Sequence, residues 1–105
     1  MYVRVNQVKF PNKMAKEAVQ NHAKNLLTNF GENSRLIRLT VDISDISHLA
    51  ISVWKDKESY KKYGSDEMNR FQQMEKEMGA VESFSEGKAT GEISKFFDKS
   101  LFEEK

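Results

Sequence analysis

The chain has 105 residues, enough for one domain with a single modest core, and its formal net charge is +1. Hydrophobic residues make up 38% and aromatic residues 10% of the chain, which excludes an intrinsically disordered protein. Basic and acidic residues are interleaved in nearly equal numbers, so the charge pattern lacks the basic patch of a nucleic-acid-binding protein, and we expect no nucleic acid as a partner.

The first predicted element is a strand from Tyr2 to Phe10, which is rich in valine and ends at Pro11. Successive side chains of a strand point to opposite faces of the sheet. One side of this strand is therefore formed by Tyr2, Arg4, Asn6, Val8 and Phe10, and the other by Val3, Val5 and Gln7.

An amphipathic helix is predicted next, from about Asn12, the expected N-cap, to Phe30, with Gly31 as the residue that follows it. Polar residues such as Lys13, Lys16 and Gln20 fall on the side of the helix opposite to the apolar arc. The apolar arc contains Met14, Ala15, Ala18, Val19, Ala23, Leu26, Leu27 and Phe30.

Two alternating segments then predict an antiparallel hairpin. In the first, apolar residues recur at every second position from Ile37 to Ile43, and the second runs from about His48 to Trp54. The short connection from Ser44 to Ser47 favours a tight hairpin. His48 begins the second strand and is expected to be exposed, so we assign it no role.

A second helical region and a last strand complete the domain. Asp56 is the predicted N-cap, Gly64 interrupts the helix, and a longer helix begins behind Ser65 or Asp66 and runs to about Met78. One arc of that helix is either a gap-filling part of the core or the lining of an apolar cavity, and it consists of Met68, Phe71, Met74 and Met78. The segment from Ala80 to Ser85 predicts the last strand.

The order strand, helix, strand, strand, helix, strand predicts an α+β, ferredoxin-like split βαβ fold over residues 1–93. In this fold a four-stranded antiparallel sheet carries two helices on one face. The strands are also apolar on the uncovered face, which predicts pairing with a second copy of the chain. Residues 94–105 form an apolar tail or short helix that is expected to pack on the domain or on the partner, through Phe96, Phe97, Leu101 and Phe102.

The chain has no cysteine, which excludes disulfides, thiolate catalysis and zinc sites built on sulfur. His22 and His48 are its only histidines, too few for a three-histidine metal site within one chain. We therefore expect neither a metal nor a cofactor. No segment is apolar over the ~20 residues that span a bilayer, and the N-terminus lacks the features of a secretion signal, so we expect no membrane partner and a cytoplasmic location.

The segment from Trp54 to Asp66 is similar to one known family. The strand ending in Val53-Trp54-Lys55, the helix Lys57-Glu58-Ser59-Tyr60 and the helix start Ser65-Asp66 resemble the antibiotic biosynthesis monooxygenase domain, a family of dimeric α/β barrels that also contains bacterial haem-degrading monooxygenases. The order of elements matches over about residues 1 to 93. The resemblance implies a homodimer whose two sheets close a barrel, with a ligand pocket between the sheet and the helices of each subunit.

The resemblance also bears on the chemistry. In the haem-degrading branch an asparagine, a tryptophan and an iron-binding histidine act together, and their positions here are held by Asn6, Tyr63 and Gln72. An amide is a poor axial ligand for haem iron compared with imidazole, so haem degradation is disfavoured. The chemistry that remains for the family is oxygenation of an electron-rich aromatic compound without a cofactor, which needs a base and a dry cavity.

The candidate ligand-binding residues are Asn6, His22, Trp54, Tyr63, Phe71 and Gln72. His22 lies at the centre of the apolar arc of the first helix and is expected to point toward the sheet, either as a pocket base or as a core histidine bonded to the backbone. Asn6 either faces a polar pocket or pairs with helix side chains. Trp54 and Tyr63 suit a pocket rim or a dimer interface.

These patterns predict a homodimer that binds a small, mainly apolar or aromatic molecule between the sheet and the helices. Such a protein is either a cofactor-independent monooxygenase, with His22 as the candidate catalytic base, or a non-catalytic ligand-binding or structural dimer of the same fold. The two differ in whether a titratable group lies beside the ligand.

Overall fold

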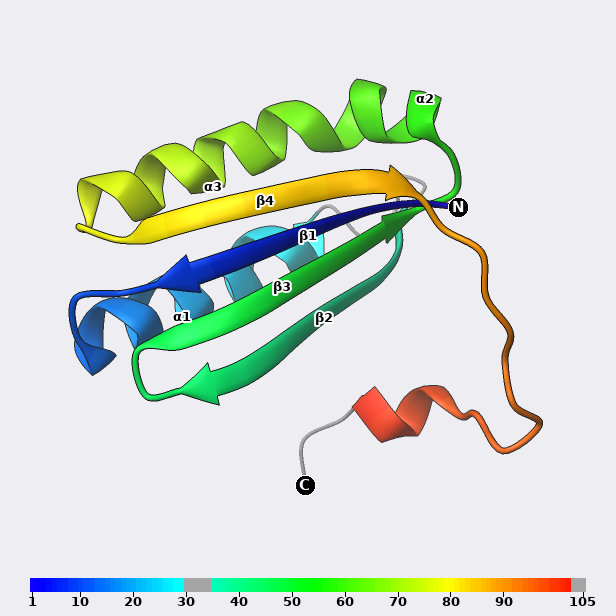
Figure 1. Cartoon of the computed structure of the whole chain (residues 1–105), viewed down its shortest axis with the longest axis horizontal. Helices are drawn as coiled ribbons and strands as arrows, with labels where there is room; N and C mark the ends of the chain where they lie inside the picture. The colour runs from blue at the N-terminus through cyan, green and yellow to red at the C-terminus, as the bar shows by residue number, and fades with distance from the viewer. Residues whose placement is uncertain (30–34, 103–105) are drawn as a thin grey trace.

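The computed structural model describes the backbone of residues 1–29 and 35–102, and the side chains of residues 1–24 and 35–102. Its four strands form one antiparallel sheet in the order β2-β3-β1-β4. In chain order they are β1 (Tyr2–Lys9), β2 (Arg35–Ser44), β3 (Ser47–Trp54) and β4 (Val81–Lys88). The long helices α1 (Lys13–Asn29) and α3 (Ser65–Glu77) lie on one face, behind the sheet in Figure 1. The predicted ferredoxin-like fold is confirmed.

The bounds of the elements agree closely with the sequence pattern. The hairpin between β2 and β3 turns at Ser44 to Ser47 as predicted, and Asn12 caps α1 by accepting a hydrogen bond from the Ala15 backbone N–H at 2.8 Å. The predicted helix end at Phe30 and the role of Gly31 lie outside the described residues. β4 extends to Lys88, beyond the predicted end at Ser85, because it pairs with β1 along its whole length. No helix in the described part of the chain is long and apolar enough to cross a membrane.

The connection from β3 to α3 is continuous helix with one wide turn. Asp56 caps the short α2 (Lys57–Ser59), accepting a hydrogen bond from the Ser59 backbone N–H at 2.7 Å. A π-helical turn, η1 (Tyr60–Gly64), then leads directly into α3. The interruption predicted at Gly64 is therefore a widened turn of the helix rather than a loop.

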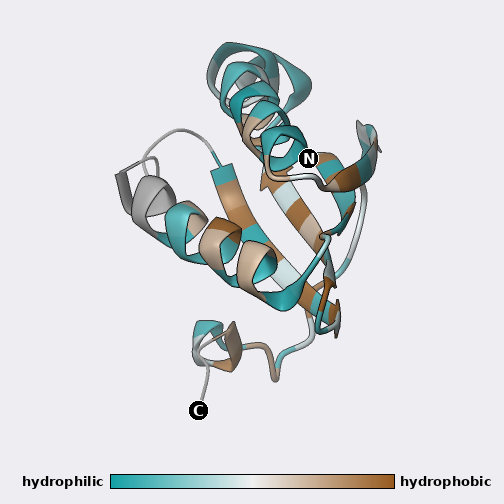
Figure 2. Ribbon diagram, turned by 90° about the vertical axis from the view of Figure 1, so that its left-hand side faces the viewer, coloured by the Kyte–Doolittle hydropathy of each residue, from teal (hydrophilic) through white to brown (hydrophobic). Residues whose placement is uncertain are grey.

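The two faces of the sheet differ in what covers them. On β1 the side formed by Tyr2, Arg4, Asn6 and Val8 is buried under the helices, as the alternation predicts, and its neighbours across the sheet are Trp54, Ser52, Ala50 and His48 of β3. Figure 2 shows polar and apolar residues alternating along the strands. The opposite face carries no element of the described chain, and we call it the open face: Val3, Val5, Ile37, Leu39, Val41, Leu49 and Ile51.

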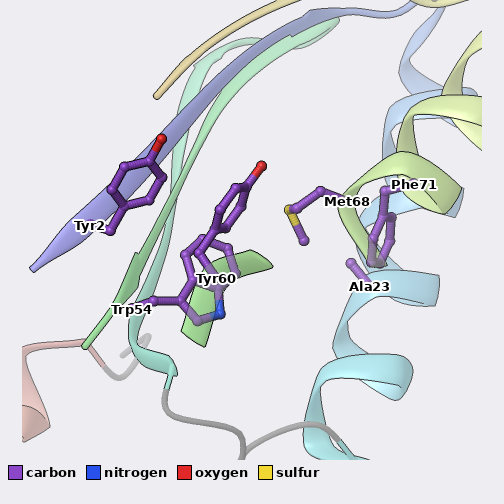
Figure 3. Packing of buried hydrophobic residues seen from close by; sticks show 6 residues of the cluster. All are labelled: Tyr2, Ala23, Trp54, Tyr60, Met68 and Phe71. Carbon is purple, nitrogen blue, oxygen red and sulfur yellow. The ribbon is translucent and has the colours of Figure 1, made fainter. Parts of the chain in front are cut away.

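The core between the sheet and the helices is divided into two clusters. The first is shown in Figure 3 and contains Tyr2, Ala23, Trp54, Tyr60, Met68 and Phe71. In it the Tyr60 ring lies edge-on to the Trp54 indole, with the ring centroids 4.8 Å apart. The second cluster contains Val8, Phe10, Ala15 and Val19. Met74 packs against both clusters, and Met78 against the second, so these two methionines fill gaps in the core.

The buried side of α1 differs from the predicted apolar arc. Met14 is 79% exposed and Ala18 is also exposed, whereas Lys16 is only 6% exposed. The reason is a tertiary contact: the Lys16 ammonium donates to the Ser44 carbonyl at 2.5 Å and lies 3.0 Å from Asp42 Oδ1, both at the end of β2. Lys16 therefore lies on the sheet-facing side of α1, together with Ala15, Val19 and Ala23. Leu26, Leu27 and Phe30 lie outside the residues whose side chains are described.

The tail leaves the sheet at the end of β4 and runs past it without regular structure as far as η2 (Lys99–Phe102), a short 3₁₀-helix (Figures 1 and 2). The rings of Phe97 and Phe102 contact each other edge-on at 5.5 Å, and Phe96 and Leu101 are largely exposed. The tail's role as a separate packing element on the domain or on a partner stays a prediction.

Candidate functional site

A cavity of about 800 Å³ lies between the sheet and the two long helices. Its wall combines charged and polar side chains with apolar ones. The polar part includes Asn6, Arg38, Thr40, His48, Ser52 and Glu75. The apolar part includes Val8, Val19, Ala23, Ala50, Met68 and Phe71, and Leu101 and Phe102 of η2 close one side. The cavity is therefore large enough for a small organic molecule and more polar than the expected apolar pocket.

A hydrogen-bonded chain joins α1 to the hairpin at one end of the cavity. The Gln20 side-chain N–H₂ donates to Asp42 Oδ1 and to His48 Nδ1, each at 3.0 Å. Since an amide nitrogen only donates, His48 Nδ1 is the acceptor, and the ring proton lies on Nε2. The hydrogen bonds from Gln20 and Lys16 hold the pKa of Asp42 below its ordinary value.

His48 is a buried, neutral histidine. It is 5% exposed, which corrects the expectation that it is exposed at the start of its strand. The reason is its register: it lies on the same side of β3 as Ala50 and Ser52 and faces the helices. Burial, followed by the positive charges of Lys16 and Arg38, lowers the pKa of His48 to about 4. At neutral pH the ring is uncharged and carries a proton at Nε2.

Glu75 and Glu82 form a carboxyl pair beside the cavity. Glu75 on α3 is 4% exposed, and both carboxylate oxygens of Glu82 are buried without a hydrogen-bond donor among the other described residues. Burial, followed by the negative charge of Glu82 and a hydrogen bond to it, raises the pKa of Glu75 to about 8. Near neutral pH Glu75 therefore holds a proton, and its carboxyl O–H donates a hydrogen bond to Glu82.

Two of the predicted ligand-binding residues line the cavity. Asn6 is buried on β1, where its Oδ1 accepts a hydrogen bond from Arg4 Nε at 3.0 Å. Its amide nitrogen donates to no other described residue. Phe71 on α3 forms part of the apolar wall. Of the two alternatives considered for Asn6, the structure supports the one in which it faces a polar pocket, and its hydrogen-bond partner is Arg4 of the same strand rather than a helix side chain.

The other four predicted residues lie elsewhere. Trp54 is 1% exposed and belongs to the packed core, and Tyr63 lies on the outer side of η1, where Lys62 Nζ is 5.2 Å from its ring. Gln72 is half-buried on α3 but does not line the cavity. His22 is exposed, and the centroid of its ring lies 6.4 Å from that of Phe71, with the two rings at an angle of 66°. The expectation that His22 points toward the sheet is wrong, because the buried side of α1 is formed by Ala15, Lys16, Val19 and Ala23 and does not include His22.

The cavity residues that reasoning from the sequence missed include Arg38, His48 and Glu75. Arg38 and His48 occupy alternate positions of β2 and β3 that the period of two assigns to the helix-facing side, so that pattern contained a usable signal. The sequence contains no signal that Glu75 lines a cavity, because a glutamate one helical turn beyond Phe71 is equally compatible with a solvent-exposed position. Among residues 1–24 and 35–102, no cluster of three histidine or acidic side chains is suited to hold a metal ion.

No protein-family model and no curated protein matches the chain. Solved structures match its fold. A protein proposed to be an antibiotic biosynthesis monooxygenase, from Deinococcus radiodurans, has a TM-score of 0.70 and 12% identity over 90% of this chain and 97% of that chain. SnoaB, a cofactor-independent oxygenase from Streptomyces nogalater, has a TM-score of 0.65 and 12% identity over 88% and 95% of the two chains. A dimeric ferredoxin-like protein from an uncultured marine organism has a TM-score of 0.68 and 10% identity over 90% and 100%.

The chain therefore has the ferredoxin-like fold of the antibiotic biosynthesis monooxygenase structures, as the resemblance of the Trp54 to Asp66 segment implies. At identities of 12% or less the likeness establishes the fold and leaves the chemistry to the residues of the cavity.

Proposed function

We propose that this protein is a homodimer that holds an aromatic molecule in the cavity of each subunit and oxygenates it without a cofactor. The observation that carries the proposal is the cavity of about 800 Å³ in which Glu75 and His48, two titratable groups with displaced pKa values, lie with Asn6. The shared fold with SnoaB, a cofactor-independent oxygenase, supports the same chemistry.

The chemistry asks for a base and for hydrogen-bond donors around an electron-rich substrate. In the proposed reaction the ionised form of Glu75 accepts a proton from a phenolic or ketonic substrate, whose anion then reduces O₂. A ring CH₂ group becomes C=O, and the second oxygen atom leaves as water, so the substrate supplies all the electrons. The Asn6 amide and His48 Nε2–H stabilise negative charge on the substrate oxygens.

The open face supports the dimer. Its residues are aliphatic on three neighbouring strands, and the cross-strand neighbours Val5, Ile51 and Leu39 form one continuous row. An apolar face of this extent is costly in water unless another surface covers it. A second copy of the chain is the proposed cover, since a neighbour of the same fold, matched over its whole length, is dimeric.

The proposal is tested by oxygen uptake with 1,8-dihydroxyanthrone, a tricyclic phenolic probe, in the presence of a chelator. Uptake above the uncatalysed rate, with the matching quinone as product, is expected for the wild type and is lost in Glu75→Gln. Glu77→Gln changes an exposed carboxylate on the same helix and should keep full activity. If the probe binds and no oxygen is consumed, the protein is a non-catalytic ligand-binding dimer, and if no probe binds, the proposed site is wrong.

A further inference from the structure

The charge balance of the cavity points to the class of molecule it selects. Arg38 lies on the helix-facing side of β2, opposite Ser52 of β3, and its side chain lines the cavity. Its guanidinium carbon is 5.7 Å from the centroid of the Phe71 ring. Within the described part of the chain, Arg38 makes neither an ion pair nor a hydrogen bond, although it is half-buried. A buried charge without a partner is costly, so this group needs an explanation.

The neighbouring cations are already paired. Arg35, on the same strand, lies 3.0 Å from Glu67 Oε1 with both side chains buried. Lys16 lies 3.0 Å from Asp42, which is also held by Gln20. These two carboxylates therefore make their ion pairs with other cations, although the negative charge of Glu67 still favours the charged form of Arg38 from a distance.

The remaining acid near Arg38 does not balance it either. Glu75 is engaged with Glu82, and at neutral pH it holds a proton. Arg38 itself stays charged, because burial and the charge of Arg35 lower its pKa only to about 10. His48 is neutral over the same range. Of the two cations that line the cavity, Lys24 is exposed, whereas Arg38 is half-buried and has no ion pair among the described residues. In surroundings of low dielectric constant the attraction of Arg38 for an anion is stronger than in water.

We infer that the cavity selects aromatic molecules that carry a negative charge, and that Arg38 binds this charge. A planar guanidinium offers two parallel N–H donors to a carboxylate, a sulfonate or a phenolate. Phe71 and Met68 lie on the apolar part of the same wall and contact the ring system. This inference rests on the proposed function, because it concerns the same cavity. It adds the charge of the ligand and the residue that binds this charge.

The test compares two fluorescent probes with one ring skeleton, 8-anilinonaphthalene-1-sulfonate, which is an anion, and N-phenyl-1-naphthylamine, which is neutral. Arg38→Gln should weaken binding of the anionic probe by about tenfold or more, because a charge-assisted hydrogen-bonded pair is lost. The affinity for the neutral probe should stay within about twofold. Arg70→Gln is the matched control, since it removes an equal charge from an exposed position of α3 and should change neither affinity.

Two further variants separate failure of this inference from failure of the proposed function. Arg38→Lys keeps the charge and loses the planar pair of donors, so its affinity for the anionic probe should lie between those of the wild type and Arg38→Gln. It replaces Arg38→Gln in the test if that variant does not fold. Thr40→Trp fills the cavity from an exposed lining position and should weaken both probes. Equal affinity of the Arg38 variants and the wild type for the anion would overturn the inference and leave the cavity intact. If Thr40→Trp changes neither probe, or neither probe binds, the proposed site falls as well.

Discussion

The indole ring of Trp54 lies against the backbone of Gly64, where a Cβ atom would be 2.5 Å from Cζ2 and 2.6 Å from Cε2 of the ring. The contact joins the last residue of β3 to the last residue of the π-helical turn. It allows the chain to return over the end of the sheet within a few residues, so that α3 begins close enough to place Met68, Phe71 and Glu75 on the cavity.

Gly64→Ala should destabilise the protein by about 1–3 kcal/mol, because the added methyl group overlaps a ring that is packed on all sides. Urea denaturation monitored by circular dichroism measures the change. The control is Gly87→Ala, where a Cβ atom meets nothing within 4 Å and the effect should stay within about 0.5 kcal/mol. Equal effects of the two substitutions would show that the indole does not require a glycine.

The raised pKa of Glu75 makes stability depend on pH. Between the ordinary pKa of a glutamate and about 8, the folded state binds a proton that the unfolded state has lost, so the free energy of unfolding falls as pH rises. Titration of His48 does not contribute to this change above about pH 6.5. The other charges beside Glu75, those of Glu82, Arg38 and Arg4, are present in both the wild type and Glu75→Gln. From pH 6.5 to 8 the free energy of unfolding of the wild type should fall by about 1–2 kcal/mol relative to that of Glu75→Gln. Glu77→Gln should follow the wild type.

His48 acts in the opposite direction at lower pH. Its pKa of about 4 in the folded state lies below the ordinary value of 6.5, so the unfolded state gains a proton first as pH falls. As the pH falls from 6.5 to 4.5, the free energy of unfolding of the wild type should fall by about 2 kcal/mol relative to that of His48→Gln. Denaturation at each pH measures this change. The charges that face it, those of Lys16, Arg38 and Asp42, remain in the variant. His22→Gln, at an exposed position, should retain the pH dependence of the wild type.

The open face should hold two subunits together. Light scattering is expected to give twice the chain mass of 12.2 kDa over a wide range of concentrations. Ile51→Glu places a charge at the centre of the open face and should give a monomer or an aggregated protein. Met14→Glu, on the exposed side of α1, should leave the mass unchanged. A soluble wild-type monomer at micromolar concentration would contradict the dimer.

The protein should not degrade haem. The resemblance implies that Gln72 holds the position of the iron-binding histidine of the haem-degrading branch, and an amide does not replace imidazole as an axial ligand. Titration with haemin, followed by a reductant, should show no saturable change of the absorption spectrum and no loss of the porphyrin. Conversion of haemin to an open-ring product would contradict this expectation, and titration of His22→Gln and His48→Gln would then identify the ligand.

The local pattern of the chain already contained the order of the elements, the two sides of β1, the cap at Asp56, the irregular turn at Gly64 and the apolar open face. These features follow from periods of two and 3.6 residues and from the backbone preferences of Asn, Asp and Gly, which act within one element. The similarity of the Trp54 to Asp66 segment to one family implies the same fold that the order of the elements predicts.

Only the tertiary structure decided which polar residues form the site. The sequence predicts that His22 points toward the sheet and that His48 is exposed, yet α1 buries Lys16 against Asp42 and Ser44 and leaves His22 exposed, while the strand register buries His48. Glu75 has a displaced pKa because it is buried and because β4 brings Glu82 to it, and Arg38 has no ion pair among the described residues, where Glu67 pairs with Arg35. Burial and pairing of charges depend on which elements meet in space, and a local pattern in the chain holds no information about a group that a distant strand supplies.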